Sequence, residues 1–356
     1  MSNLDHIGPL PSEVIGVMAG PCSAESREQT LETALRLAQT GVRTFRAGLW
    51  KPRTHPGGFE GVGAEGLPWL SEVRERTGMR VATEVATPEH VAQCVQAGVD
   101  ILWIGARTTA NPFAVQAIAD ALTAVEHKPI VLVKNPVSPD LELWIGALQR
   151  LADAGVTRLG AVLRGFSAYG EQVYRNRPHW SIAFELKRRF PGLSVVCDPS
   201  HIAGRRGLVE DVARKAVTLR FDGLMIEVHT DPDKALSDSA QQLTPDQIAA
   251  LLSDIATTEK SDSPANDTTL EDLREQIDRL DESLVEILAR RMELAERIGT
   301  YKHERGISVV QPSRYQDMMR LRVDLGEQRG LSPDFMRRIF TGIHEESVRR
   351  QLDTDK

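Results

Sequence analysis

The amino-acid sequence predicts an α/β protein in which a (β/α)8 TIM barrel is followed by a small all-α helical domain. Three observations lead to this fold class. Between residues 14 and 229, eight short β-rich apolar runs alternate with longer stretches of helical apolar spacing. Residues 253–268 are polar and contain Pro264, as is typical of interdomain linkers. Beyond them, one apolar stripe of coiled-coil type continues from Leu273 to Tyr301.

The barrel is predicted from the number and order of the apolar runs. A doubly wound open sheet would share the alternation of strand and helix, but the number eight favours a closed barrel. We therefore expect a barrel domain over residues 1–252, a linker over 253–268 and a helical domain over 269–356. The eight expected strands are residues 14–20, 44–49, 80–85, 101–106, 129–135, 159–165, 193–199 and 223–229.

The helical domain is expected to contain one long and two shorter helices. Thr268 and Glu271 have the spacing of a capping box at the start of the long helix. Two further helical segments lie near residues 312–327 and 333–352, with Gly330 and Pro333 as breakers between them. Because so long an apolar stripe needs a partner, we expect a homodimer formed through this domain.

Composition narrows the classes of function. The formal net charge of -7 argues against a nucleic acid or an anionic membrane as the main partner. No apolar run approaches the roughly 20 residues that span a bilayer, and the N-terminus lacks the pattern of a signal peptide. Three widely spaced cysteines suit a reducing compartment rather than a disulfide framework. We expect a cytoplasmic protein.

Reactive side chains follow nearly every expected strand, at the end where barrel enzymes carry their active sites. Cys22, His201, Glu227 and Asp238 would meet there, because the first strand of a closed barrel adjoins the eighth. Alone, a cysteine after a strand usually packs and a loop carboxylate is usually solvated. Together, these sulfur, nitrogen and oxygen ligands indicate one divalent ion such as Mn, Fe, Co or Zn. We assign Cys94 and Cys197 to packing.

Five cations share the same barrel mouth: Lys51, Arg53, Arg107, Lys134 and Arg164. Any one of them, taken alone, is best explained as a surface residue with a carboxylate neighbour. Five together repel one another unless an anion lies among them, and this favours ligands with phosphate and carboxylate groups.

These residues lie within motifs that carry a family resemblance. The segments GPCSAE, FRAGLWKPRTHPGGFEG, TEV, GART, LVKNP, LRG, DPSH and EVH…ALSD resemble, in this order, type I 3-deoxy-D-arabino-heptulosonate 7-phosphate (DAHP) synthase of the beta subgroup. The resemblance covers residues 14–252. KPRT at 51–54 distinguishes this family from sister synthases that use longer aldoses, which remain the alternative for the barrel.

The resemblance implies condensation of phosphoenolpyruvate with erythrose 4-phosphate, the first step of the shikimate pathway. It assigns the metal to Cys22, His201, Glu227 and Asp238. It places Arg46 and Lys51 at the carboxylate of phosphoenolpyruvate, with Lys51 and Glu84 as candidates for proton transfer. It assigns the phosphate of phosphoenolpyruvate to Arg107, Lys134 and Arg164, and that of erythrose 4-phosphate to Arg53 and Thr54.

Two cations also mark the long helix. Arg291 interrupts the apolar stripe, and Lys302 lies 11 residues later, close to three helical turns, on the same face. They indicate a dianion site or, equally well, side chains that reach solvent from a dimer seam. The segments LREQIDRLDESLVEILARRMELAERIGTYK, QPSR and HEESVRRQ resemble the all-helical class of chorismate mutase over residues 270–352. That resemblance implies a cofactor-free rearrangement of chorismate to prephenate, with substrate held by Arg274, Arg291, Lys302, Arg314, Ser347 and Gln351.

Two positions depart from the mutase pattern. Gln311 stands where the family usually has Asp, and Tyr315 where it usually has Glu or Gln. The domain could therefore be only a regulatory or dimerisation module, and a related helical fold acts on isochorismate as a pyruvate lyase. We hypothesise that the domain is both a mutase and a feedback sensor that binds prephenate or chorismate and slows the barrel reaction.

Overall fold

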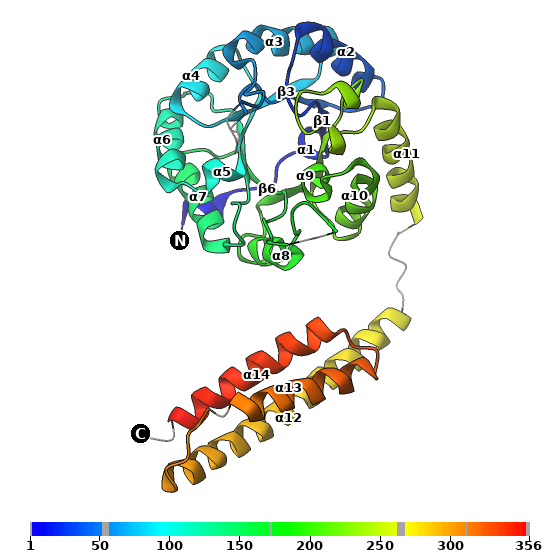
Figure 1. Ribbon diagram of the computed structural model, residues 1–356. Coiled ribbons are helices and arrows are strands. Elements are labelled where there is room, and N and C mark those ends of the chain that lie inside the picture. Colours follow the sequence, from blue (N-terminus) through cyan, green and yellow to red (C-terminus); the bar gives the residue numbers. More distant parts are fainter. Residues whose placement is uncertain (1, 52–56, 171–172, 262–267, 311, 354–356) are drawn as a thin grey trace. The chain divides into compact units, whose positions relative to one another are not determined.

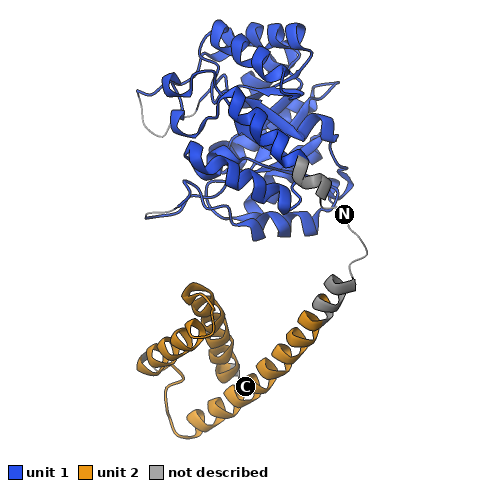
Figure 2. Ribbon diagram, turned by 90° about the vertical axis from the view of Figure 1, so that its right-hand side faces the viewer, with its two compact units in different colours: residues 1–262 blue, residues 263–356 orange. Residues whose placement is uncertain are grey.

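The computed structural model describes residues 2–51, 57–170, 173–261, 268–310 and 312–353. The chain forms two compact units, Met1–Asp262 and Ser263–Lys356 (Figure 2). Helix α11 (Pro245–Ser261) belongs to the first unit and takes up about half of the stretch 253–268 that the sequence analysis assigned to a linker. The polar composition of that stretch does not distinguish an exposed helix from a loop, which explains the difference.

The first unit is a closed barrel of parallel strands in the order β1 to β8, and β8 pairs with β1 (Figure 1). All eight expected strands are confirmed. They are β1 (Val17–Gly20), β2 (Thr44–Arg46), β3 (Arg80–Val85), β4 (Ile101–Ile104), β5 (Ile130–Lys134), β6 (Leu159–Leu163), β7 (Ser194–Cys197) and β8 (Gly223–Glu227).

Helices surround the barrel and bury its outer face. Besides α11 they are α2 (Arg27–Ala38), α3 (Leu67–Thr77), α4 (Pro88–Gln96), α5 (Ala106–Thr109), α6 (Pro112–Thr123), α7 (Leu141–Asp153), α8 (Trp180–Arg189), α9 (Pro199–Ala203) and α10 (Val209–Thr218). The short helices α5 and α9 follow β4 and β7 directly, so they carry side chains at the mouth of the barrel.

One part of the first expected strand is wrong. Residues 14 and 15 lie in a short helix, α1 (Ser12–Ile15), and β1 begins only at Val17, where it pairs with Leu224. Val14 and Ile15 join the cluster of apolar side chains that fills the barrel interior. An apolar plug helix and a buried strand have the same composition, so the sequence did not separate them.

The alternation of side chains along each strand determines which of them point into the mouth of the barrel. Met18, Ala82, Leu132, Val196 and Met225 fill the interior of the barrel. Because successive side chains point to opposite faces, a residue two positions further on also points inward, nearer the carboxyl end. This parity places a ring of buried polar side chains above the apolar interior: Glu84, Lys134, Asp198 and Glu227.

The second unit contains α12 (Thr268–Glu304), α13 (Pro312–Glu327) and α14 (Pro333–Asp353), which confirms the three expected helices. Helix α14 packs against both α12 and α13. The small core of this unit includes Met292, Ala295, Val323 and Met336. Among the described residues of both units, we find no helix with the length and apolarity that a membrane crossing requires.

Candidate active site

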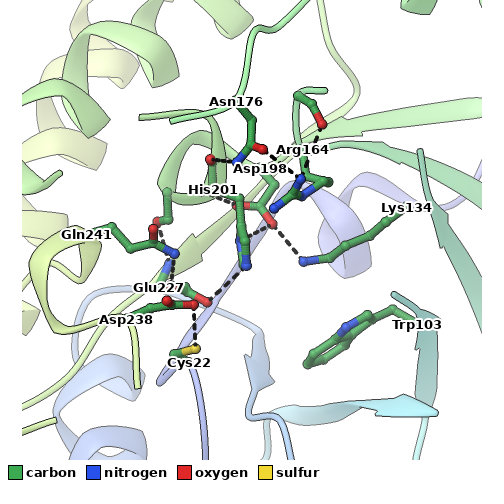
Figure 3. Close-up of polar contacts among 12 residues, drawn as sticks. Cys22, Trp103, Lys134, Arg164, Asn176, Asp198, His201, Glu227, Asp238 and Gln241 are labelled. Carbon is green, nitrogen blue, oxygen red and sulfur yellow. Dashed lines mark hydrogen bonds and ion pairs between the residues drawn. The ribbon is translucent and has the colours of Figure 1, made fainter. Parts of the chain in front are cut away.

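Three of the predicted metal ligands converge at the mouth of the barrel (Figure 3). Cys22 follows β1 and Glu227 ends β8, two strands that pair up to Gly20 and Glu227. Asp238 comes from the loop beyond β8. The ligand atoms of Cys22, Glu227 and Asp238 lie within 4.8 Å of one another, and Cys22 Sγ is 3.5 Å from Asp238 Oδ2.

His201, on helix α9, lies beside this group. Its Nε2 is 3.8 Å from Glu227 Oε1, and its Nδ1 is 2.8 Å from Asp198 Oδ2. Asp198 also caps α9, because its Oδ1 accepts a hydrogen bond from the His201 backbone N–H at 3.0 Å. Asp198 therefore orients the imidazole with Nε2 toward the cluster. Carboxylates that contact the other ring nitrogen of a metal-binding histidine commonly have this role.

The electrostatics of the cluster suit a cation. Burial, followed by the charge of Glu227, raises the pKa of the Cys22 thiol to about 12. Burial also raises the pKa of Glu227, but His201 and Arg46 outweigh it, so that pKa lies below its ordinary value. Burial raises the pKa of Asp238 too, but His201 and Arg175 outweigh it, so both carboxylates that face the buried sulfur have pKa values below their ordinary values. This donor set of sulfur, oxygen and nitrogen fits a divalent transition metal, which would favour the thiolate form.

Arg46 and Lys51 lie next to the cluster. Arg46 is fully buried, donates to the Cys22 carbonyl at 3.0 Å, and places Nη1 3.3 Å from Glu227 Oε1. Its guanidinium also lies over the ring of Trp103, at 4.7 Å from the centroid. Burial lowers the pKa of Lys51, but the nearby Cys22, Glu84 and Glu227 together outweigh it and leave this pKa above its ordinary value.

A second group of cations lies across the mouth. Lys134 is buried, with Nζ 2.8 Å from Asp198 Oδ2. Burial lowers the pKa of Arg164 to about 10; Asp198 opposes this, and the charges of Arg175 and Arg107 add to it. Arg164 therefore lies in a site where positive charge is disfavoured. The negative charge of a phosphate group would offset both the desolvation of the guanidinium and its repulsion by the neighbouring arginines.

The remaining predicted barrel residues are Glu84, Arg53 and Thr54. Glu84, in β3, accepts a hydrogen bond from Trp103 Nε1 at 3.0 Å, so its carboxylate lies inside the mouth. Arg53 and Thr54 lie outside the described residues.

The sequence analysis assigned no role to four residues that support the site: Asp198, Arg175, Asn176 and Gln241. Asp198 had a signal, because it lies two positions beyond the inward-facing Val196. Arg175 and Asn176 come from a loop and Gln241 from a single 3-10 turn (Ser239–Gln241), and nothing in their spacing indicated the contacts they make.

The second unit brings together Arg291, Ser347 and Gln351. Arg291 Nη1 donates to Ser347 Oγ and to the Ile343 carbonyl, and Gln351 donates to the Ser347 carbonyl at 3.2 Å. Burial, followed by the charge of Arg291, lowers the pKa of His344, and Lys302 adds to this effect. The positive charges of Arg291 and Lys302 are therefore both close enough to His344 to affect its pKa.

The other predicted mutase residues are placed as follows. Arg274 is exposed and lies about 26 Å along α12 from Arg291, at 1.5 Å per residue. Arg314 is exposed near the start of α13. Tyr315 packs against His344, with ring centroids 4.4 Å apart, and its hydroxyl is 3.4 Å from Thr341 Oγ1. Gln311 lies outside the described residues.

Comparison with known proteins identifies two families along the chain. Residues 12–261 match the model of the DAHP synthetase I family, and residues 273–352 match that of chorismate mutase type II. A phospho-2-dehydro-3-deoxyheptonate aldolase of Thermotoga maritima is 37% identical over 227 residues, which span 64% of this chain and 64% of that relative. A 2-dehydro-3-deoxyphosphooctonate aldolase of Desulfatibacillum aliphaticivorans is 32% identical over 270 residues, which span 69% of this chain and 93% of the relative.

Solved structures agree with the sequence relatives. The crystal structure of the Thermotoga maritima phospho-2-dehydro-3-deoxyheptonate aldolase (DAHP synthase) matches with a TM-score of 0.62 and 31% sequence identity. The match covers 69% of each chain.

Proposed function

We propose, because this chain belongs to the DAHP synthetase I family, that its barrel condenses phosphoenolpyruvate with erythrose 4-phosphate and water to give DAHP and phosphate. The chain also contains a domain of the chorismate mutase type II family, for which we propose the rearrangement of chorismate to prephenate. The chain would thus be both a transferase and an isomerase. The observation that carries the first proposal is the convergence of Cys22, Glu227 and Asp238 beside a set of buried cations.

In the proposed reaction, Cys22, His201, Glu227 and Asp238 hold a divalent metal of the Mn, Fe, Co or Zn type. Such an ion supplies Lewis-acid polarisation of the aldehyde oxygen.

The protein's other residues position the two substrates. Arg46 and Lys51 would bind the carboxylate of phosphoenolpyruvate, and Arg107, Lys134 and Arg164 its phosphate, which directs C3 of the enol toward the aldehyde. Water then adds at C2, and phosphate leaves by C–O cleavage. Glu84 and Lys51 border the mouth and are the side chains we propose for moving protons.

The choice of aldose is open to a direct test, because the relatives include both heptonate and octonate enzymes. We expect purified protein to consume phosphoenolpyruvate at least tenfold faster with erythrose 4-phosphate than with arabinose 5-phosphate. The reason proposed is that KPRT at 51–54 resembles the motif of the family that uses the shorter sugar. Phosphate release with each aldose, together with identification of the product by mass spectrometry, is the measurement. Faster turnover of arabinose 5-phosphate would assign the barrel to the sister reaction.

For the helical domain, we propose a homodimer formed along α12. Ile277, Leu280, Leu284 and Ile287 have exposed side chains on this helix, and Leu280 is 69% exposed. A stripe of this kind is stable in water only when another apolar surface covers it. A second copy also explains why Arg274 lies so far along the helix from Arg291, since Arg274 would then serve the partner's site.

The dimer predicts a change of mass on substitution. We expect Leu280→Glu combined with Leu284→Glu to halve the mass measured by light scattering, because two charges per helix would have to be buried in the interface. Phe113→Glu is the matched control, since Phe113 is 88% exposed but lies on α6 of the barrel. An unchanged mass in the double variant would contradict the proposed interface.

A further inference from the structure

The loop between β6 and α8 contributes two adjacent residues to the candidate metal site, Arg175 and Asn176. We propose that Arg175–Asn176 is a positioning segment that holds the metal ligands in place and links them to the phosphate-binding Arg164. The inference rests on the proposed metal site, and it adds two residues that neither of the family resemblances assigned.

Arg175 ties together two carboxylates of the cluster. Its Nη1 donates to Asp238 Oδ1 at 3.0 Å and to Gln241 Oε1 at 2.8 Å. Gln241 in turn donates from Nε2 to Glu227 Oε2 at 2.7 Å. One guanidinium therefore fixes Asp238 directly and Glu227 through a single side chain. Each carboxylate keeps its other oxygen toward the cluster: Asp238 Oδ2 lies 3.5 Å from Cys22 Sγ, and Glu227 Oε1 lies 3.8 Å from His201 Nε2.

The conformation of Asp238 shows why such a contact is needed. Its backbone lies in the left-handed region, with φ at 45°. That conformation is costly for a residue other than glycine and persists only where the surroundings enforce it. The ion pair with Arg175 and the neighbouring Gln241 supply that constraint, so that Asp238 faces the cluster instead of relaxing toward solvent.

Asn176 acts on the other side of the site (Figure 3). Its Nδ2 donates to the carbonyl of His201 at 2.7 Å, and its Oδ1 accepts from Arg164 Nη1 at 3.0 Å. The side chain is only 5% exposed. Asn176 is thus a direct bridge between the residue that presents an imidazole to the cluster and a residue of the predicted phosphate site.

The backbone of Arg175–Asn176 lies close to helix α9 and to two glycines. The N–H groups of Arg175 and Asn176 donate to the carbonyls of Ala203 and Ile202 on helix α9, at 3.3 and 3.2 Å. Glycines lie opposite both side chains. A Cβ at Gly204 would lie 2.2 Å from Arg175 Cβ, and one at Gly165 would lie 2.8 Å from Asn176 Cβ. Both glycines also have positive φ, at 69° and 78° respectively, so a side chain at either position would be strained as well as crowded.

The test measures metal binding without substrate, so it does not depend on which aldose the barrel uses. We expect Arg175→Ala to weaken equilibrium binding of Mn²⁺ and Co²⁺ about 10- to 100-fold, the range found when outer residues around metal ligands are removed. The thiolate-to-Co²⁺ absorption should remain, because Cys22 is untouched, but at a higher metal concentration. Arg175→Lys should recover part of the lost affinity, because it keeps a charge near Asp238.

Arg205→Ala is the matched control. Arg205 lines the same surface depression as Arg175, but its side chain donates to the Val173 carbonyl and contacts none of the four proposed ligands. Equal metal affinity in wild type and Arg175→Ala, or equal losses in Arg175→Ala and Arg205→Ala, would overturn the positioning role. Failure of wild-type protein to bind either metal would instead overturn the metal site itself.

Asn176→Ala separates positioning from general destabilisation. We expect it to weaken Co²⁺ binding and also to raise KM for phosphoenolpyruvate, because Arg164 loses its shorter hydrogen bond, to Asn176 Oδ1, and keeps only the 3.5 Å contact of Nη1 with the Gly165 carbonyl among those described. Arg175→Ala should leave that KM nearly unchanged at saturating metal. Thermal unfolding of both variants checks that the barrel remains folded. Identical effects of the two variants on KM would contradict the link between Asn176 and Arg164.

Discussion

Cys22→Ala is expected to abolish the condensation reaction and to leave the mutase rate unchanged. Cys22 contributes the only sulfur among the three converging groups, and its backbone carbonyl also accepts from Arg46. A Lewis-acid ion stabilises such a reaction by several kcal/mol, and each 1.4 kcal/mol corresponds to about tenfold in rate. We therefore expect a loss of roughly a thousandfold or more. The proposed mutase reaction is assigned to the other compact unit, and the family resemblance implies no cofactor for it.

Both reactions are measured on one preparation, by consumption of phosphoenolpyruvate and of chorismate. Cys94→Ala is the control, because Cys94 is also buried but packs within α4 and belongs to the apolar core. Treatment of wild type with a chelator should reproduce the Cys22→Ala result, and added Mn²⁺ should reverse it. Full condensation activity in Cys22→Ala would refute the proposed ligand set, and loss of both activities would point to a folding defect.

The sequence was sufficient for the barrel and for much of its mouth, for a physical reason. Each strand of a parallel barrel is buried on both faces, so it leaves a dense apolar run, and each ends at the same rim. A polar residue such as Lys134 at the end of an apolar run is therefore conspicuous. Asp198 is marked in the same way at the end of the seventh run. Inward parity predicts the direction of its side chain, but not its contacts with His201 and Lys134, which depend on tertiary geometry.

Other features had no such signal. Arg175 and Asn176 lie in a loop, where side-chain direction depends on backbone turns and on contacts with α9 that spacing does not encode. The plug helix at Val14 and Ile15 has the composition of a strand, and α11 continues into residues whose polarity also suits a linker. In each case the deciding interaction is tertiary, and local propensity is weak beside it.

Arg291→Ala is expected to abolish the mutase reaction and to spare condensation, the reverse of Cys22→Ala. Burial lowers the pKa of Arg291, with Arg322 adding to the effect, so this cation is held where an anionic substrate would stabilise it. It is also fixed by Ser347 and the Ile343 carbonyl, which means that it is oriented before substrate arrives. Removal of one preorganised donor of this kind costs about 100- to 1000-fold in rate.

The control is Arg290→Ala, because Arg290 is the adjacent arginine of α12 and is exposed. It changes the net charge by the same amount at the same depth along the helix, so an effect confined to Arg291→Ala reports the site rather than the overall charge. A mutase rate in Arg291→Ala close to that of wild type would exclude the surroundings of Arg291 as the chorismate site.

Arg291→Ala also tests the hypothesis that the helical domain is a feedback sensor. If prephenate slows the barrel by binding at Arg291, saturating prephenate should reduce condensation in wild type and in Arg290→Ala but not in Arg291→Ala. The coupling must run through binding at this site, because an effector shifts an equilibrium only by its difference in affinity between the two states. An unchanged condensation rate in wild type, with prephenate binding demonstrated by calorimetry, would show that the two units work independently. Inhibition that persists in Arg291→Ala would place the effector at the barrel instead.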